Sequence, residues 1–280
     1  MTLAINPFPK SFSALFARTL LHFIVITPSF LLAFSAKATD DGLSAHTSAF
    51  LTPVTPSTLS WQQQESVHLH YDLVGETHHF PYNVPADIDW QISPTQYKVK
   101  LEISQLFLGT KTQISQGDVL PKTGITPQLF IDKFRSEDQV VFNRTRDLLE
   151  YSSTSTTEHL EPFAQDQLSV TFQLGFWIAQ NFSQLLNGAT MTVQLVAKNH
   201  FEMREFKFIG SETLTLPIGK VDTFKIVRLP RSDDDQHATV WLLKNHGLTL
   251  GRLLLEEKNG DFIDQKLSQL DLIPGLKLAE

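Results

Sequence analysis

The sequence predicts a mainly β protein, a single antiparallel curved sheet or half-open barrel with one long helix packed on or in it. Two observations support this class. Apolar side chains stand at every second position in many short segments, which is the period of a half-buried antiparallel strand. A single segment, residues 167–186, instead has apolar residues three and four apart, the period of a helix. We therefore expect a strand-rich fold with one helical element.

The alternating segments start at Val67 and recur to Leu270. They cover residues 67–73, 88–92, 97–103, 140–142, 191–196, 206–216, 221–229, 238–243, 248–255 and 262–270. Asn259-Gly260 separates the last two segments, and both residue types tolerate positive φ. We expect a type I′ hairpin at this dipeptide.

The predicted helix carries apolar residues at Leu168, Phe172, Phe176, Ala179, Phe182 and Leu186. Asp166 is a candidate N-cap, and Asn187-Gly188 supplies a stop signal. Further apolar residues widen the apolar arc until little polar face remains: Leu174, Trp177, Ile178 and Leu185. Such a helix needs cover on more than one side, as it would have across or inside a curved sheet.

The first 38 residues resemble an export signal. Lys10 and Arg18 precede an apolar run over residues 20–34, and Ala36-Lys37-Ala38 matches a signal-peptidase site. The run is shorter than the roughly 20 residues that a membrane-spanning helix needs. We predict a signal peptide over residues 1–38, a flexible linker over 39–60 and a single β-rich domain over 61–280. The protein is then periplasmic after cleavage of the signal peptide.

Composition limits the partners and the chemistry. The chain has 23 basic and 30 acidic side chains and a net charge of -7. An acidic chain without a basic cluster repels phosphate backbones, so we expect no nucleic acid partner. There is no cysteine, which excludes disulfides, thiolate metal sites and cysteine catalysis. A lipid-anchored bacterial protein needs a cysteine at the cleavage site, so we expect no stable membrane anchor after cleavage.

Four blocks of sequence, in order, resemble an uncharacterised family of exported proteobacterial proteins, domain of unknown function 3108. They are Ser115-Gln116-Gly117 with Gly124-Ile125-Thr126-Pro127, Gln165-Asp166-Gln167-Leu168-Ser169, Pro217-Ile218-Gly219-Lys220 with Arg228-Leu229, and Val240-Trp241-Leu242. The resemblance implies a periplasmic β-rich fold similar to the half-open barrels of outer-membrane lipoprotein carriers. It implies no established activity and no catalytic residue.

The sequence offers two groups of candidate metal ligands. His68 and His70 share one strand face, and a hairpin turn at Gly75-Glu76 would bring Asp72 opposite His79, giving ligand types that suit zinc or copper. We favour a solvated strand face, because the helical His-Glu-x-x-His arrangement is absent. The run from Asp233 to Asp235 before His237 lacks the ligand spacing of a calcium loop, so we interpret it as a hairpin tip. We assign no metal site.

No motif for catalysis or cofactor binding occurs in the chain. The Gly-x-Ser-x-Gly elbow, the phosphate loop and the dinucleotide fingerprint are all absent from the sequence. Ser169 is a candidate nucleophile only if a base lies within reach, which spacing does not show. We therefore expect no catalytic residue and no cofactor, and we favour a protein that is not an enzyme.

Aromatic residues give the main functional lead. Seven are expected to face inward and are our candidate ligand-binding residues: Trp90, Phe107, Phe172, Phe176, Trp177, Phe182 and Trp241. A curved sheet with a helix across its mouth encloses either a packed core or an apolar cavity. The main hypothesis is a non-enzymatic periplasmic protein that binds a lipid, lipoprotein or other amphiphile on the concave side of the sheet. The alternatives are an envelope scaffold that binds a protein partner and, as a minor possibility, a metal-binding protein or hydrolase.

Overall fold

The computed structural model describes residues 66–105, 109–185, 188–232 and 235–273. The predicted signal peptide and linker lie outside these residues, and so does Phe107. The elements are β1 (Val67–Thr77), β2 (Phe80–Ile92), β3 (Gln96–Gln105), β4 (Gly109–Leu120), β5 (Gly124–Lys133), β6 (Glu137–Asn143), β7 (Leu148–Tyr151), β8 (Thr157–His159), β9 (Gln165–Asp166), α2 (Ser169–Leu185), β10 (Thr190–Val196), β11 (Phe201–Leu216), β12 (Gly219–Arg228), β13 (His237–Leu243), β14 (Leu250–Glu256) and β15 (Phe262–Leu272).

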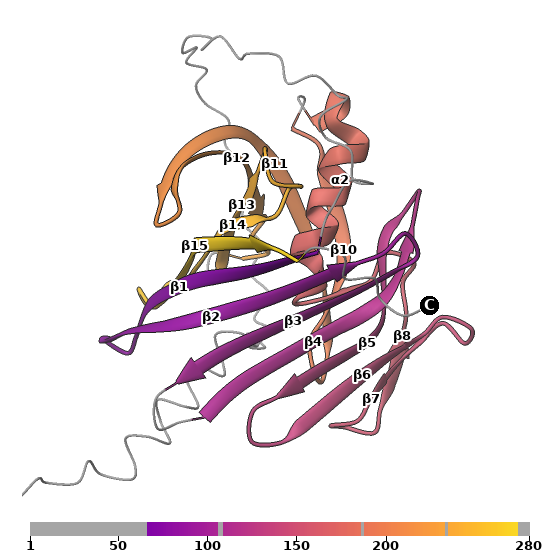
Figure 1. The fold of residues 1–280 in the computed structure, drawn as a ribbon. Helices are drawn as coiled ribbons and strands as arrows, with labels where there is room; N and C mark the ends of the chain where they lie inside the picture. Colours follow the sequence, from indigo (N-terminus) through magenta and orange to yellow (C-terminus); the bar gives the residue numbers. More distant parts are fainter. Residues whose placement is uncertain (1–65, 106–108, 186–187, 233–234, 274–280) are drawn as a thin grey trace, which may run out of the picture.

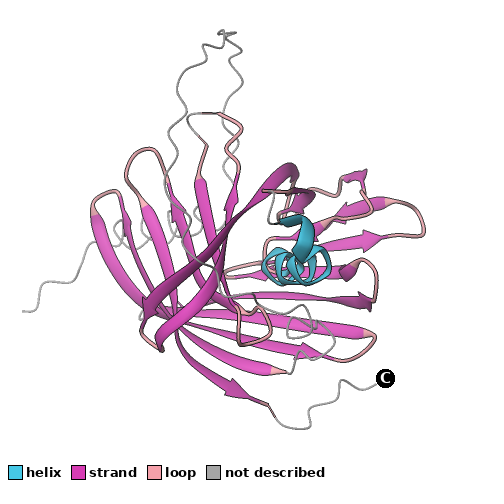
Figure 2. Ribbon diagram, turned by 90° about the horizontal axis from the view of Figure 1, so that it is seen from above, coloured by secondary structure: helices cyan, strands magenta, loops and turns pink. Residues whose placement is uncertain are grey.

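All the strands belong to one curved sheet. Its order is β8-β7-β6-β5-β4-β3-β2-β1-β15-β14-β13-β12-β11-β10-β9, so the pairing of β1 with β15 joins the two halves of the chain. Neighbouring strands are antiparallel except β9 and β10. Figure 1 shows the curvature of the sheet, and Figure 2 shows α2 almost end-on inside the curve. The predicted fold class is confirmed, and each predicted strand segment overlaps an observed strand.

The helix α2 begins and ends close to the predicted positions. The carboxylate of Asp166 accepts hydrogen bonds from the amides of Leu168 (3.0 Å) and Ser169 (2.8 Å), so Asp166 caps the first turn as predicted. At the other end the amide of Gly188, which has a φ of +73°, donates to the carbonyl of Leu185. A glycine in this left-handed conformation is a common helix C-terminus.

The core lies between α2 and the concave face of the sheet. Trp90 of β2 stacks on Phe172 of α2, with ring centroids 4.0 Å apart and planes 8° from parallel. Tyr97 of β3 also stacks on Trp90, with ring centroids 5.7 Å apart. All three side chains are buried. The stack fixes the first half of the helix against the middle of the sheet.

Two turns differ from the sequence prediction. In the β14–β15 hairpin Gly260 has a φ of +91° but Asn259 does not have a positive φ, so the turn is not type I′. The amide of Gly260 instead donates to the carbonyl of Glu257, which gives a type I turn followed by a left-handed glycine. The β1–β2 turn is at His78 and His79, both of which have positive φ, rather than at Gly75-Glu76.

Candidate ligand-binding cavity

A cavity of about 140 Å³ lies between the first half of α2 and the concave face of the sheet. The helix contributes Val170 and Leu174, Leu168 lies just before it, and strands β1 to β4 and β10 to β15 contribute most of the remaining wall. Aliphatic side chains such as Val240 and Leu253 form most of the lining. An engineered cavity of about 150 Å³ binds benzene. The cavity therefore has room for one ring or a segment of a hydrocarbon chain before any rearrangement.

Six polar side chains interrupt the apolar lining: Gln113, Gln167, Thr171, Arg228, Gln236 and Gln265. Arg228 is the one charged residue among them. It is 6% exposed, and its Nη2 donates to the backbone carbonyl of Gln236 at 2.5 Å. Burial and the neighbouring Arg204 guanidinium lower the pKa of Arg228 to about 10, so it remains cationic at neutral pH. The cavity thus combines apolar walls with one buried positive charge.

Two buried donors on this wall have no hydrogen-bond partner within the described residues, Nε of Arg228 and Nε2 of Gln265. Nearby acidic groups are already paired, because Asp235 and Glu202 both contact the buried guanidinium of Arg204. A buried donor without a partner costs about 1–3 kcal/mol. The wall is therefore suited to a ligand that carries hydrogen-bond acceptors or a negative charge.

The helix is fastened to the sheet on the side away from β13–β15. The amide side chain of Gln173 donates to a backbone carbonyl of the β4–β5 turn at 2.8 Å and accepts from the amide of Ile125 at 3.0 Å. Gln180 donates to another carbonyl of the same turn at 2.6 Å. On the other side the helix also packs closely against the loop between β13 and β14, because a Cβ added at Gly175 would lie 3.1 Å from the carbonyl oxygen of Leu248. The cavity occupies the space that these contacts leave beside the helix.

The predicted aromatic residues are distributed differently from our expectation. Of the six that the structure describes, none lines this cavity. Trp90 and Phe172 form the core stack, and Phe182, which is partly buried, packs against Phe224 at 5.5 Å. Mainly aliphatic residues line the cavity instead, and none of them is among the seven predicted ligand-binding residues.

Phe176 and Trp177 line a second, separate groove of about 300 Å³. The groove lies on the other side of α2, where Met191 of β10 and the exposed ring of Phe163 complete its apolar part. Trp177 packs against the core but is only partly buried. Lys122, Gln180 and other polar residues also border the groove, which makes it a more polar site than the cavity.

The expectation that Trp241 faces inward is also wrong. Its neighbour Val240 lines the cavity, and because side chains alternate along β13, Trp241 points to the opposite face. There its indole Nε1 donates to Glu212 at 2.9 Å, and the guanidinium of Arg252 lies 4.7 Å from its ring centroid. The long side chains of Glu212 and Arg252 cover Trp241 on the convex face, and a pattern of apolar residues in the sequence does not indicate such cover.

A buried polar network lies on the inward face of β4 and β5. Lys111 forms an ion pair with Asp132, and Gln113 donates to the other carboxylate oxygen of Asp132 at 2.9 Å. Burial lowers the pKa of Lys111. Asp166 is fully buried as well, and burial raises its pKa to about 6 although Ser115 and the helix amides donate to it. The hydroxyl of Ser169 is buried in this cap, where it accepts a hydrogen bond from the amide of Asp166, so it does not present a nucleophile to solvent.

The candidate metal ligands are only partly brought together. His68 and His70 lie on one face of β1, but Asp72 pairs with Pro85 in the register, far from the turn that holds His79. His79 instead lies 3.5 Å from Glu76. In the calcium candidate, Asp233 and Asp234 lie outside the described residues, and Asp235 accepts hydrogen bonds from Arg204 and from the amide of Arg231. Within the described residues, Asp72 and His79 thus do not join His68 and His70 in one group.

Comparisons with known proteins add information on the fold. The sequence matches no family model and no curated protein. A solved β-barrel-like protein of domain of unknown function 1849 from Brucella abortus is similar, with a TM-score of 0.50 and 10% identity, over 75% of this chain and 98% of that chain. A LolA superfamily protein from Nitrosomonas europaea has a TM-score of 0.31 and 12% identity over 79% and 94% of the two chains. Lipoprotein LppX from Mycobacterium tuberculosis has a TM-score of 0.28 and 14% identity over 80% and 100%.

Of these three structures, the Brucella protein has the highest TM-score, and at 10% identity it supports a conclusion on the fold alone. In the part of the chain that the structure describes, no helix has the length and hydrophobicity to cross a membrane. This chain therefore has a β-barrel-like fold similar to that of the domain of unknown function 1849 protein.

Proposed function

We propose that this chain is a periplasmic protein without enzymatic activity that binds the apolar part of an anionic amphiphile in the cavity beside α2. The observation that carries the proposal is an aliphatic cavity with one buried arginine, Arg228, on its wall. A fatty acid or acylated lipid combines the two properties that this wall favours, an alkyl chain and an anionic group. The proposal includes export by the signal peptide and membership of the domain of unknown function 3108 family.

The volume defines how such a ligand would bind. Drug-sized ligands occupy pockets of about 300–1,000 Å³, whereas this cavity measures about 140 Å³. A short chain segment fits directly, and a longer chain has to move α2 away from β13–β15. The contacts of Gln173 and Gln180 lie on the opposite side of the helix, whereas the packing of Gly175 against Leu248 has to separate in this movement.

The scaffold alternative has less support. A protein partner that adds a strand needs an exposed edge, and strands β8 and β9 at the two edges of the sheet contain three and two residues. β8 and β9 themselves offer few backbone groups for pairing, and the longer stretch without a strand neighbour is in β10 (Thr190–Val196), of which β9 pairs only with Leu195 and Val196. We therefore place a lipid or lipoprotein ligand before a protein partner bound at an edge.

Adjacent residues on β14 provide a matched test of the cavity. Leu253 lines the cavity and Leu254 does not, because successive side chains point to opposite faces. Isothermal titration with dodecanoate is expected to show binding to the wild type and to Leu254→Trp, and at least about tenfold weaker binding to Leu253→Trp. Equal affinity in the two variants would contradict the proposed site.

The headgroup preference is tested separately at Arg228. Wild type is expected to prefer dodecanoate over dodecyltrimethylammonium, and Arg228→Gln is expected to lose that preference. The ratio of the two affinities is compared within each variant, so a general loss of stability does not imitate the result. A preference that survives Arg228→Gln would contradict the role of this arginine.

A further inference from the structure

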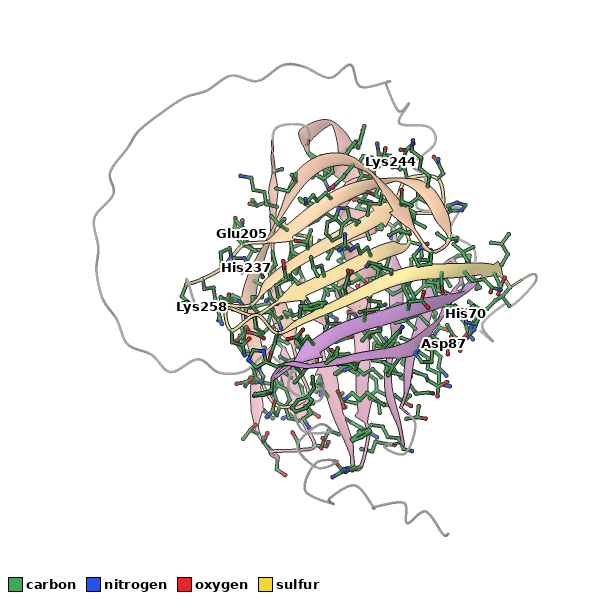
Figure 3. All side chains as sticks on the ribbon, turned by 90° about the vertical axis from the view of Figure 1, so that its left-hand side faces the viewer. His70, Asp87, Glu205, His237, Lys244 and Lys258 are labelled. Carbon is green, nitrogen blue, oxygen red and sulfur yellow. The ribbon has the colours of Figure 1, made fainter. Side chains whose placement is uncertain are left out.

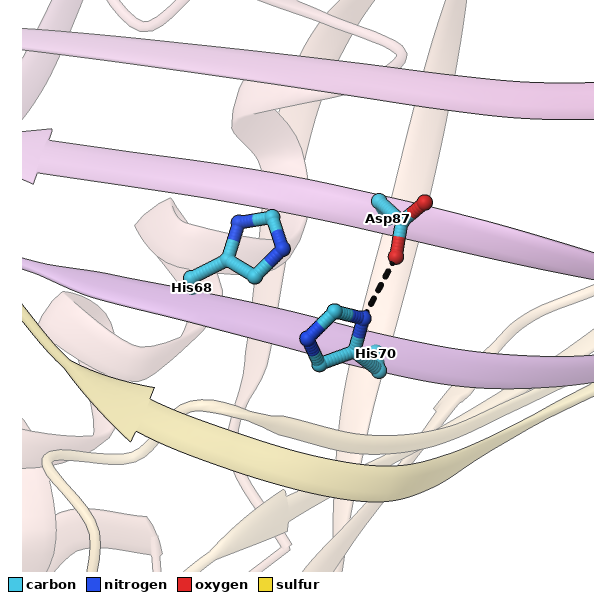
Figure 4. A group of neighbouring side chains, drawn as sticks. All are labelled: His68, His70 and Asp87. Atoms are coloured by element: carbon cyan, nitrogen blue, oxygen red, sulfur yellow. Dashed lines mark hydrogen bonds and ion pairs between the residues drawn. The ribbon is translucent and has the colours of Figure 1, made fainter.

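A group of histidines and carboxylates lies on the convex face of β1 and β2, on the other side of the sheet from the cavity. His68 and His70 alternate along β1, so their rings project from the same face. The register places Asp89 beside His68 and Asp87 beside His70 on β2. Figure 3 locates His70 and Asp87 on the two strands, and Figure 4 shows the two rings and the Asp87 carboxylate turned toward one another.

The distances in this group suit a metal ion. One potential ligand atom from each of His68, His70 and Asp87 lies within 4.8 Å of the others. Tetrahedral ligands about 2.0–2.1 Å from a zinc ion are about 3.3 Å apart, so side-chain movements of about 1 Å complete the coordination. Imidazole and carboxylate are ligand types that zinc and copper accept.

Neighbouring carboxylates strengthen the case. Nδ1 of His68 donates a hydrogen bond to the Asp89 carboxylate, which leaves Nε2 of that ring available as the metal ligand. Nδ1 of His70 donates to Asp87 at 2.7 Å, a hydrogen bond that metal coordination by Asp87 would replace, and the Asp271 carboxylate of β15 lies 3.6 Å from Nε2 of His70. Three carboxylates thus surround two imidazoles, an arrangement that attracts a cation. The histidine and aspartate side chains are about one-third to one-half exposed, so an ion reaches the site from solvent and water can complete the coordination.

We propose that His68, His70 and Asp87 bind a divalent transition metal ion, zinc or copper, on the convex face of the β1–β2 hairpin. The site differs from the predicted set, because Asp87 takes the place of Asp72 and His79. Asp89 acts as a positioning residue that orients the ring of His68. The proposal is independent of the amphiphile cavity, since the two sites lie on opposite faces of the sheet.

Titration of the untagged, EDTA-treated protein with zinc chloride tests the site. The expected result is one equivalent of zinc bound with a dissociation constant of about 1 μM or below. His68→Ala, His70→Ala and Asp87→Asn are each expected to weaken binding by at least about tenfold. His79→Ala and Asp72→Asn are matched controls from the same hairpin and are expected to keep the wild-type affinity.

Copper provides a readout of the ligands themselves. The electron paramagnetic resonance spectrum of the Cu²⁺ complex is expected to show coupling to two nitrogens in the wild type and to one in either histidine variant. Far-UV circular dichroism checks that each variant is folded. A wild-type dissociation constant weaker than about 100 μM for both metals would overturn the proposal. So would wild-type affinity in the folded His70→Ala variant.

Discussion

Replacing Phe172 by alanine removes the aromatic ring that packs α2 onto the sheet. Phe172 is 4% exposed and stacks on Trp90 at 4.0 Å. An aromatic side chain of this kind buries about 150 Å², which at about 25 cal/mol per Å² gives about 4 kcal/mol. This value lies within the range of about 3–5 kcal/mol seen for buried phenylalanine to alanine changes. The loss is a large part of the stability of a typical domain.

Urea unfolding followed by far-UV circular dichroism measures this loss, because that signal does not depend on the four tryptophans of the chain, one of which the control variant removes. The melting temperature should fall by about 8–16 °C, at about 2–4 °C per kcal/mol for a domain of this size. Trp177→Ala serves as the control: Trp177 lies on the same helix but is only partly buried, so its loss should be well below that of Phe172→Ala. If Phe172→Ala loses less than about 1 kcal/mol, the stack does not hold the helix.

Three further perturbations test the buried polar groups and the helix contact. The raised pKa of Asp166 means that the folded protein keeps this proton to a higher pH than the unfolded chain does. The free energy of unfolding should therefore fall by about 2 kcal/mol as the pH rises from 4 to 6, relative to Asp166→Asn, and equal pH profiles of the two proteins would refute this. Lys111→Met leaves the Asp132 carboxylate buried without its cation and should lower the free energy of unfolding in urea by about 3–5 kcal/mol. The double variant Lys111→Met, Asp132→Leu should recover most of this stability, and full additivity of the two single-variant losses would refute the pairing. Gly124 has a φ of +89°, and Gly124→Ala would place a Cβ against Oε1 of Gln173. Calorimetry should show a loss of more than about 1 kcal/mol in the free energy of unfolding, and unchanged stability would refute the close helix contact.

Sequence periodicity predicts strands well where one face is apolar. The alternation from Val67 to Leu73 places buried residues at every second position of β1, and the structure has the same pattern. Strand β4 has no such alternation, because its inward residues are Lys111, Gln113, Ser115 and Gly117. A buried polar face is satisfied by partners from distant strands, which local sequence does not identify. The periodicity method therefore missed β4.

The candidate site was less predictable than the fold. The inward direction of Trp90 and Phe172 follows from their positions in strand and helix patterns, and the structure agrees. Trp241 is buried too, but Arg252 and Lys225 cover it on the convex face. An apolar residue in a strand can therefore be buried without facing the concave side of the sheet. Arg228 had no sequence signal that separates it from a surface arginine. Its position on the same face of β12 as the apolar Ile226 was the one available indication.

The central claim is that an amphiphile binds between α2 and β13–β15. Nuclear Overhauser effects between ¹³C-labelled dodecanoate and the methyl groups of the protein locate the ligand directly. The proposed site predicts contacts from the alkyl chain to the methyl groups of Leu174, Val240 and Leu253, which line the cavity. Contacts to Met191 of the second groove without contacts to those three residues would contradict it.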